Sequence, residues 1–184
     1  MNPNPDSLRR NVELKAWDPD PERSISVCRE LGAADRGVLR QRDTYFQVRR
    51  GRLKLRDETP GRPVLVQYDR PDDAAARESR YRLVPVEDAE LLRAALEAAL
   101  GVLVVVDKER RLFLWENVRI HLDRVEGLGA CIEFEAVAPP ESDLAPERAK
   151  VARLRAAFGI GDDRLVATSY SALLLGRDRT RRIE

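Results

Sequence analysis

Most of the chain alternates polar and apolar residues with a period of two. In "RNVELKAW", Asn11, Glu13 and Lys15 fall on one side of the alternation, and small or branched apolar residues fall on the other. A period of two is typical of a β-strand with one buried face. The pattern predicts about eight strands, in the segments "RNVELKAW", "VLRQRDTYFQV", "GRLKLRDE", "PVLVQYDRP", "SRYRLVPV", "LVVVDKERRLFLWE", "VRIHLDRVEG" and "GACIEFEAVAP".

Other segments have the apolar spacing and the end signals of helices. The first begins at an Asp20 N-cap with Pro21 in its first turn, and Gly32 marks its stop. Three more helices are predicted, at about 87–100, from about Pro146 to a stop at Gly159, and in a short last segment that ends at Gly176.

The order of these elements indicates an α+β fold with a mainly antiparallel sheet, because many strands follow one another directly along the chain. So many consecutive strands close well into a barrel. We expect a single domain over residues 9–176, with flexible termini at 1–8 and 177–184.

The polar faces of these strands are charged rather than neutral. A single charged face is typical of a solvated surface, but here several strands share the property. If the helices cover the apolar strand faces on the outside, the charged faces line the interior of the barrel. The basic sets are Arg52-Lys54-Arg56, Arg80-Arg82 and Lys108-Arg110, and the carboxylates on other strands are Glu13, Asp123, Glu133 and Glu135.

An interior with opposite charges on opposing walls needs an occupant, because unpaired buried charge is costly. Carboxylates bind hard divalent cations such as Mg²⁺ and Mn²⁺. Arginine and lysine bind phosphate oxygens. A triphosphate that carries a divalent metal would satisfy both walls, and the residues alone indicate a ligand of this kind.

An ordered set of motifs resembles the CYTH superfamily of triphosphate tunnel metalloenzymes. The sequences of these motifs are most similar to the class IV adenylate cyclase-like branch, and the superfamily also includes thiamine triphosphatases. The resemblance implies an eight-stranded antiparallel tunnel with helices packed outside. It also implies a linear triphosphate substrate, namely ATP, thiamine triphosphate or inorganic triphosphate. The motifs are "NVELK", "QRDTYF", "GRLKLR", "YDRP", "SRY", "VDKERR", "RIHLDRVEGLG", "IEFE" and "TSYSALL".

The family signature ExExK has one departure in this chain. It reads Asn11-Val12-Glu13-Leu14-Lys15, so the first carboxylate is replaced by a neutral amide. An amide coordinates a cation only through its carbonyl oxygen. We expect weaker metal binding, or one metal where the family pattern allows two.

The candidate site residues follow from the charged faces and the resemblance together. The expected ligands of Mg²⁺ or Mn²⁺ are Glu13, Asp123, Glu133 and Glu135. The expected phosphate-binding residues are Lys15, Arg52, Lys54, Arg56, Arg70, Lys108, Arg110 and Arg119, and of these Lys15, Lys54 and Lys108 are the candidate catalytic residues.

The remaining polar and aromatic candidates are weaker. His121, the single histidine, shares a face with Arg119 and Asp123, and lumenal and structural roles are equally compatible with that position. The tyrosines and tryptophans are expected in the core or at the rim rather than in catalysis; they are Tyr45, Tyr68, Tyr81, Tyr170, Trp17 and Trp115.

The composition mainly argues against other classes of protein. The 33 basic and 32 acidic residues give a net charge of +1, which argues against a general nucleic-acid binder. Cys28 and Cys131 are expected to be reduced and buried. The first residues do not resemble a signal peptide, and no run is long and apolar enough to span a membrane. We therefore expect a cytoplasmic protein, and a tunnel with exposed rims is compatible with a homodimer.

Three functions remain open at this point. The first is a metal-dependent triphosphatase, because the charged residues specify the triphosphate better than any group attached to it. The second is a class IV adenylate cyclase that converts ATP to cAMP and pyrophosphate, which the sequences of the motifs favour. The third is a non-catalytic polyphosphate or nucleotide binder, which the Asn11 substitution suggests.

Overall fold

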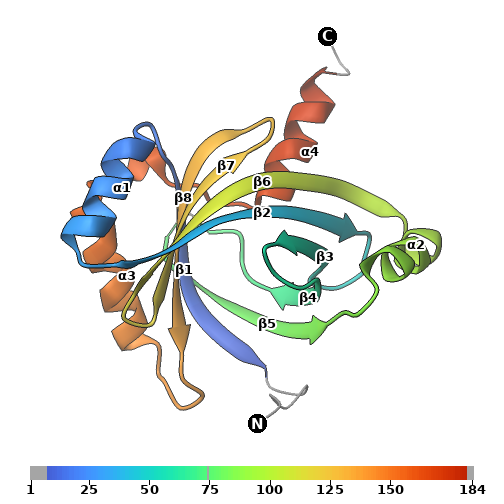
Figure 1. Cartoon of the computed structure of the whole chain (residues 1–184), viewed down its shortest axis with the longest axis horizontal. Coiled ribbons are helices and arrows are strands. Elements are labelled where there is room, and N and C mark those ends of the chain that lie inside the picture. Colours follow the sequence, from blue (N-terminus) through green and yellow to red (C-terminus); the bar gives the residue numbers. More distant parts are fainter. Residues whose placement is uncertain (1–7, 74, 182–184) are drawn as a thin grey trace.

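The computed structural model describes residues 8–73 and 75–181, and within them eight strands form a closed antiparallel barrel (Figure 1). Around the barrel the strands follow the order β1-β5-β4-β3-β2-β6-β7-β8. The predicted α+β fold is therefore confirmed. The strands are β1 (Arg9–Trp17), β2 (Ala34–Phe46), β3 (Arg52–Thr59), β4 (Val64–Asp69), β5 (Arg77–Pro85), β6 (Val102–Trp115), β7 (Val118–Val125) and β8 (Gly129–Ala138).

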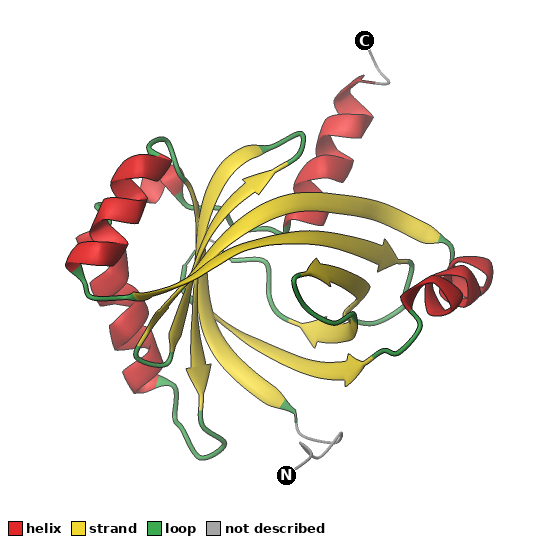
Figure 2. Ribbon diagram, in the orientation of Figure 1, coloured by secondary structure: helices red, strands yellow, loops and turns green. Residues whose placement is uncertain are grey.

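Four α-helices of the described residues lie outside the barrel (Figure 2). Helices α1 and α3 lie at one side of it, α2 at the opposite side, and α4 projects away from the strands (Figure 1). A short 3-10 turn precedes α4. The bounds are α1 (Pro21–Glu30), α2 (Ala89–Leu100), α3 (Ala145–Ala157), the 3-10 turn (Asp162–Arg164) and α4 (Tyr170–Arg181).

The ends of the helices agree with the sequence signals at α1 but not at α4. Asp20 caps α1 by accepting a hydrogen bond from the Arg23 amide at 3.1 Å, and Gly32 follows the helix with a φ of 71°. At the other end of the chain, α4 does not stop at Gly176 but continues to Arg181. A single glycine inside a helix costs only about 1 kcal/mol relative to alanine, so it need not end one.

The main core lies between the outer surface of the barrel and helices α1 and α3. The apolar positions of β1 point into it, and Val12 and Ala16 are fully buried there. Leu154 of α3 is also fully buried in this core. Because side chains alternate along a strand, the outward placement of the apolar set turns the polar set into the barrel. The predicted interior of charged residues follows from this packing.

Strand β5 is the exception to the predicted charged faces. Arg80 and Arg82 point outward, where Arg80 pairs with Glu78 at 2.9 Å and Arg82 bonds the Gln67 side chain at 3.1 Å. The prediction that Arg80 and Arg82 line the interior was therefore wrong. Both faces of "RESRYRLVP" contain polar residues, so alternation alone could not choose between them. The interior set on β5 is Ser79, Tyr81 and Leu83.

The cysteines and one tryptophan behave as expected. Cys28 and Cys131 are free thiols with no exposed surface, and burial raises the pKa of each to about 12. Trp115 is buried in the main core, with the guanidinium of Arg153 over its ring at 5.0 Å. Among the described residues, none of the helices has the length and apolar character that crossing a membrane requires.

Candidate active site

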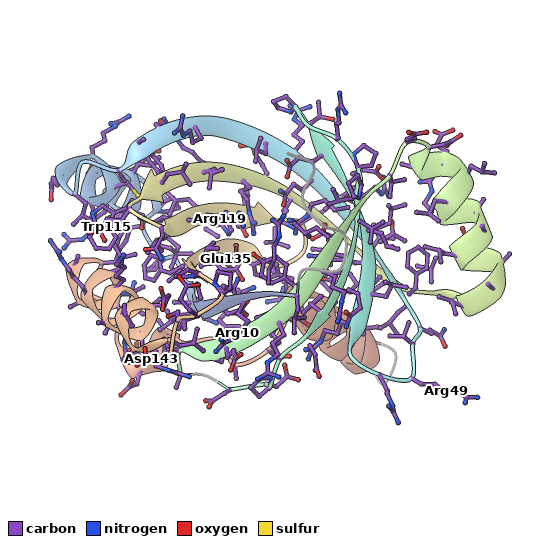
Figure 3. All side chains as sticks on the ribbon, turned by 90° about the horizontal axis from the view of Figure 1, so that it is seen from below. Arg10, Arg49, Trp115, Arg119, Glu135 and Asp143 are labelled. Atoms are coloured by element: carbon purple, nitrogen blue, oxygen red, sulfur yellow. The ribbon has the colours of Figure 1, made fainter. Side chains whose placement is uncertain are left out.

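The barrel encloses a cavity whose walls differ in chemistry. Strands β3 and β6 contribute basic side chains, β1, β2 and β8 contribute carboxylates, and β4 and β5 contribute mostly aromatic and aliphatic ones. Figure 3 shows Arg119 and Glu135 on neighbouring strands of this barrel. Both residues line the cavity. The structure thus brings together most of the predicted site residues, from five strands and from Arg70, which directly follows β4.

Three basic residues of the site converge on one carboxylate, Asp43 of β2. Lys54 and Lys108 donate to Asp43 Oδ2 at 2.8 and 2.7 Å. Arg56 donates to both carboxylate oxygens, at 2.8 and 3.1 Å. The Asp43 side chain is 1 % exposed, so this cluster is almost completely removed from solvent.

The pKa values in this cluster follow from burial and from the neighbouring charges. Burial alone would raise the pKa of Asp43, but Arg56, Lys108 and Lys54 outweigh it and hold the value well below the usual range. Burial lowers the pKa of Lys108 to about 7, even though Asp43 opposes the shift. The like charges of Arg56, Arg110 and Lys54 lower it further. Lys108 is therefore close to its titration midpoint at neutral pH.

Glu133 of β8 forms the centre of the acidic wall. Lys15 lies 2.8 Å from its Oε1, and Arg110 and the His121 ring lie 3.1 and 3.2 Å from its Oε2. Burial would raise the pKa of Glu133, but Lys15, His121 and Arg110 hold it well below the usual range. Lys15 also lies 3.7 Å from the ring centre of Tyr170.

Glu135 has weaker ion pairs than Glu133. Its Oε2 lies 3.6 Å from Arg119 and 3.9 Å from the His121 Nε2. Its pKa is nevertheless lowered, because the charges of His121, Arg119 and Arg110 exceed the effect of burial. Glu135 is therefore ionised, lines the cavity and has acceptor capacity for a ligand.

His121, Glu133 and Glu135 could hold a metal ion together. Each offers one ligand atom, and these atoms all lie within 4.8 Å of one another. Glu133 and Glu135 line the cavity, and so does Asn11, whose buried Oδ1 has no hydrogen-bond partner within 8–73 and 75–181. An oxygen-rich set with one imidazole fits a divalent first-row ion such as Mn²⁺, and the carboxylates alone also suit Mg²⁺.

Glu13 lines the cavity as expected but already has two partners. Arg70 donates to its Oε1, and the Arg77 Nε donates to the same atom at 3.3 Å. The Arg77 guanidinium also donates to the carbonyl of Ala167 at 2.9 Å, which ties this corner to the segment before α4. The sequence predicted Glu13 as a metal ligand and Arg70 as a phosphate clamp, and in the structure the two side chains pair with each other.

Asp123 lies behind the cavity rather than on its surface. Arg110 donates to its two oxygens at 2.6 and 2.7 Å, and the Tyr170 hydroxyl donates to Oδ2 at 2.9 Å. Its side chain is fully buried. Asp123 therefore holds Arg110 in place, and its predicted role as a metal ligand stays a prediction that this geometry does not favour.

The two remaining predicted clamps lie at the periphery. Arg52 pairs with Asp72 at 2.8 Å and donates to the Arg70 carbonyl at 3.2 Å, outside the residues that line the cavity. The Arg119 side chain is 39 % exposed at the rim. Of the eight predicted phosphate-binding residues, seven line the cavity: Lys15, Lys54, Arg56, Arg70, Lys108, Arg110 and Arg119.

Several residues of the site were not predictable from the sequence. Asp43 alternates in phase with Tyr45 in "QRDTYF", which placed it on the polar face, but nothing in the pattern showed that three cations would meet there. Arg77 precedes the strand pattern of β5 and gave no signal. The tyrosines lie in the core as predicted, in a buried cluster inside the barrel, and there they also line the cavity: Tyr45, Tyr68, Tyr81 and Tyr170.

The sequence model of the CYTH domain matches residues 9–170 of this chain. The chain belongs to the CYTH domain family. No curated protein matches it in sequence. Its first strand carries Asn11 where the resemblance led us to expect a glutamate.

Solved structures share the CYTH barrel at low sequence identity. The PH1012 protein from Pyrococcus horikoshii OT3 is 22 % identical with a TM-score of 0.80, over 89 % of this chain and 98 % of that one. A proposed adenylate cyclase from Vibrio parahaemolyticus is 19 % identical with a TM-score of 0.73, over 91 % and 99 %. HpAC1 from Hippeastrum is described as a proposed adenylyl cyclase with a dominant triphosphatase activity. It is 16 % identical with a TM-score of 0.60, over 92 % and 95 %. These likenesses show that the chain shares the fold of these structures.

Proposed function

We propose that this CYTH protein is a divalent-metal-dependent triphosphatase. The observation that carries the proposal is the composition of the cavity. Four buried or half-buried cations, Lys54, Arg56, Lys108 and Arg110, share it with the carboxylates Glu133 and Glu135. A chain of phosphates bound to a divalent ion complements both sets, and few other small ligands combine the two charges.

The metal would be held by His121, Glu133 and Glu135, with the carbonyl oxygen of Asn11 as a neutral neighbour. When bound, a divalent ion neutralises phosphate charge and lowers the pKa of a coordinated water. The imidazole among the donors favours Mn²⁺ over Mg²⁺.

The residues of the chain supply positioning and charge stabilisation. Lys54, Arg56 and Lys108 would bind oxygens of the phosphate chain, because transfer of a phosphoryl group needs orientation and charge neutralisation more than covalent chemistry. Glu135 would accept a hydrogen bond from the attacking water, since its own ion pairs are the longest on the acidic wall. The terminal P–O bond breaks, water supplies the new oxygen, and orthophosphate leaves with diphosphate or a diphosphate ester.

The class IV adenylate cyclase reaction is the second candidate, and the uncharged wall of the cavity favours it. Val66 and Tyr68 of β4 and Tyr81 and Leu83 of β5 line this wall. Bare triphosphate has no apolar surface to place against them, whereas a nucleoside does. In this reaction the ribose 3′-hydroxyl would attack the α-phosphorus, and pyrophosphate would leave.

One incubation separates the candidates. The protein is mixed with Mg²⁺ or Mn²⁺ and, separately, with tripolyphosphate or ATP, and the products are resolved by ion-exchange chromatography and ³¹P NMR. Orthophosphate released from either substrate is the expected result. Formation of cAMP and pyrophosphate from ATP would instead identify a cyclase. Saturable binding without turnover would identify a non-catalytic binder and overturn both catalytic proposals.

Two arginine variants connect the activity to the cavity. Arg56→Met removes a clamp and should lower kcat/KM about 100-fold, the typical effect of losing one charge-stabilising group. Arg82→Met is the matched control, because Arg82 is exposed on the outer face of β5. Equal activity of the two variants would show that the reaction takes place elsewhere.

A further inference from the structure

Asp43 occupies a position that a phosphate group would be expected to fill. Its Oδ2 accepts hydrogen bonds from Lys54, Lys108 and Arg56, at 2.8, 2.7 and 3.1 Å. Three cations are thereby held within hydrogen-bond reach of one oxygen atom. The resemblance to a bound phosphate raises the question of whether Asp43 competes with the substrate or prepares its site.

The cations of this cluster have N–H donors that Asp43 does not use, so Asp43 need not compete with a phosphate for them. A lysine ammonium has three N–H donors, and Lys108 is seen to use one of them on Asp43. The Arg56 guanidinium donates to Asp43 through Nε and Nη2, so Nη1 is left for another acceptor. Each cation can therefore bind Asp43 and a phosphate oxygen at the same time.

Burial explains why the cluster needs an internal anion. Lys108 and Asp43 side chains are each 1 % exposed, and Lys54 is 11 % exposed. Cations at this depth repel one another strongly, because little solvent screens them. One carboxylate among three cations leaves a net charge of about two units for the ligand and holds the cations together before the ligand arrives.

We propose that Asp43 is a positioning residue that keeps Lys54, Arg56 and Lys108 assembled and charged for binding of the phosphate chain. The inference rests on the proposed function in one respect only, namely that a polyphosphate is the ligand. It assigns Asp43 no contact with the substrate.

Lys108 is the group through which this role is measurable, because its pKa of about 7 lies in an accessible range. Inside the barrel, the charges that face it are Asp43 from β2, Lys54 and Arg56 from β3, Arg110 from β6 and Asp123 from β7. Lys108 also lines a second, more open cavity, where the charged residues are exposed or half-buried; they are Arg40, Arg42, Asp57, Asp107, Glu109, Arg124 and Glu126. Because Asp43 is the charge that most raises the pKa of Lys108, its loss should deprotonate Lys108 at neutral pH.

Asp43→Asn distinguishes this role from a simple charge effect. Removing a negative charge from an anion site should by itself tighten polyphosphate binding. The positioning role predicts the opposite near pH 7, where Lys108 of the unsubstituted protein is about half protonated, namely a loss of about tenfold or more in tripolyphosphate affinity by calorimetry. It also predicts recovery of affinity as the pH is lowered, because Lys108 is protonated again.

The titration of Lys108 is followed directly by ¹³C NMR of the lysine Cε resonances, assigned with Lys108→Met. In Asp43→Asn the Lys108 midpoint should fall by roughly 1–3 pH units, the usual effect of losing an adjacent opposite charge. Asp43→Glu, which keeps the carboxylate, should return the midpoint toward 7. An unchanged midpoint in Asp43→Asn, or tighter tripolyphosphate binding at every pH, would overturn the proposal.

Two further variants keep the test decisive. Asp18→Asn is the matched control, because Asp18 is a buried carboxylate outside the cavity that accepts a bond from Ser24 at 2.9 Å. It should change neither the affinity nor the Lys108 midpoint. If Asp43→Asn does not fold, Lys54→Met carries the test, since removing one cation of the cluster should raise the Lys108 midpoint. A fixed midpoint in Lys54→Met would show that the cations are not coupled.

The NMR measurement also separates the two proposals. Should the unsubstituted protein bind no tripolyphosphate, the proposed function would fail. The Lys108 midpoints would still decide whether Asp43 holds the cations charged.

Discussion

At the scale of single residues, the cavity contains fewer carboxylates that could bind a metal than the sequence of the chain predicts. Asn11 is neutral, and Glu13 is occupied by Arg70 and Arg77. The first strand therefore offers no unpaired carboxylate among its described residues. Glu133 is also ion-paired, with Lys15 and Arg110, but its ligand atom lies close to those of Glu135 and His121, so the acidic contribution to a metal site falls to Glu133 and Glu135.

Restoring the missing carboxylate should strengthen metal binding. Asn11→Glu places a charge where the Asn11 Oδ1 is now buried without a partner in the described chain. We expect the Mn²⁺ affinity to rise about tenfold, equivalent to about 1.4 kcal/mol, and a second ion to bind. Titration by Mn²⁺ electron paramagnetic resonance measures both. Asn11→Gln is the neutral control, and equal Mn²⁺ binding by the two variants would contradict the role given to this position.

His121 should determine which metal the site prefers. Since an imidazole nitrogen is a better ligand for first-row transition ions than for Mg²⁺, His121→Gln should weaken Mn²⁺ binding about tenfold and leave Mg²⁺ binding nearly unchanged. Competition between the two ions in the same resonance titration measures the ratio. A parallel loss of both ions would indicate that His121 only orients Glu133.

At the scale of elements, one face of the strands serves stability and the other face forms the site. Outward residues pack against α1 and α3, and inward residues form the cavity. Mutations on the helical side should therefore change stability without changing chemistry.

Leu154→Ala tests this separation. Leu154 of α3 is fully buried, so its truncation should cost about 2–5 kcal/mol and lower Tm by roughly 10 °C. The KM of the folded protein should not change. Leu91→Ala on α2 is the matched control, because Leu91 is 68 % exposed and its loss should alter the free energy of unfolding by under about 0.5 kcal/mol. Calorimetry and steady-state kinetics on both variants check the expectation.

The elements also show what the sequence could and could not predict. Alternation turned Glu133 into the barrel because its apolar neighbours Ile132 and Phe134 pack in the core on the outer face. Lys108, which lies between Asp107 and Glu109, was placed only by its phase with Arg110. Alternation could not predict that Asp43 would meet Lys108, since that contact depends on the register between β2 and β6. Nor could it predict that Arg77 would reach Glu13, because those residues are joined only when β1 pairs with β5. Inward direction is a local property, whereas ion pairing depends on distant strands.

At the scale of the whole molecule, the buried charges make stability depend on pH in two windows. Asp43 and Glu133 have folded pKa values well below their ordinary ones, and Asp123 is lowered as well. The unfolded chain therefore binds more protons than the folded chain in acid. Their contribution is complete above about pH 5 and is lost as the pH falls toward the folded values.

Lys108 acts in the second window. Its folded pKa of about 7 lies below the ordinary lysine value of 10.5, so the unfolded chain again binds more protons between these limits. The free energy of unfolding should rise with pH from about 7 to 10.5. Urea unfolding from pH 2 to 10 measures both windows, and Lys108→Met should remove only the alkaline rise. A rise that persists in Lys108→Met would assign it to another group.

The closure of the barrel also has a kinetic consequence. The seam is made by β1 and β8, so Arg10 near the start of the chain pairs with Ala138 far along it. To form contacts between such distant residues, the chain must lose the entropy of closing a long loop before the contacts can stabilise it. Chains rich in such contacts therefore fold slowly. Until the last strand has been added, the first has an open edge, and a ribosome-bound or truncated chain would expose that edge to pairing with other chains.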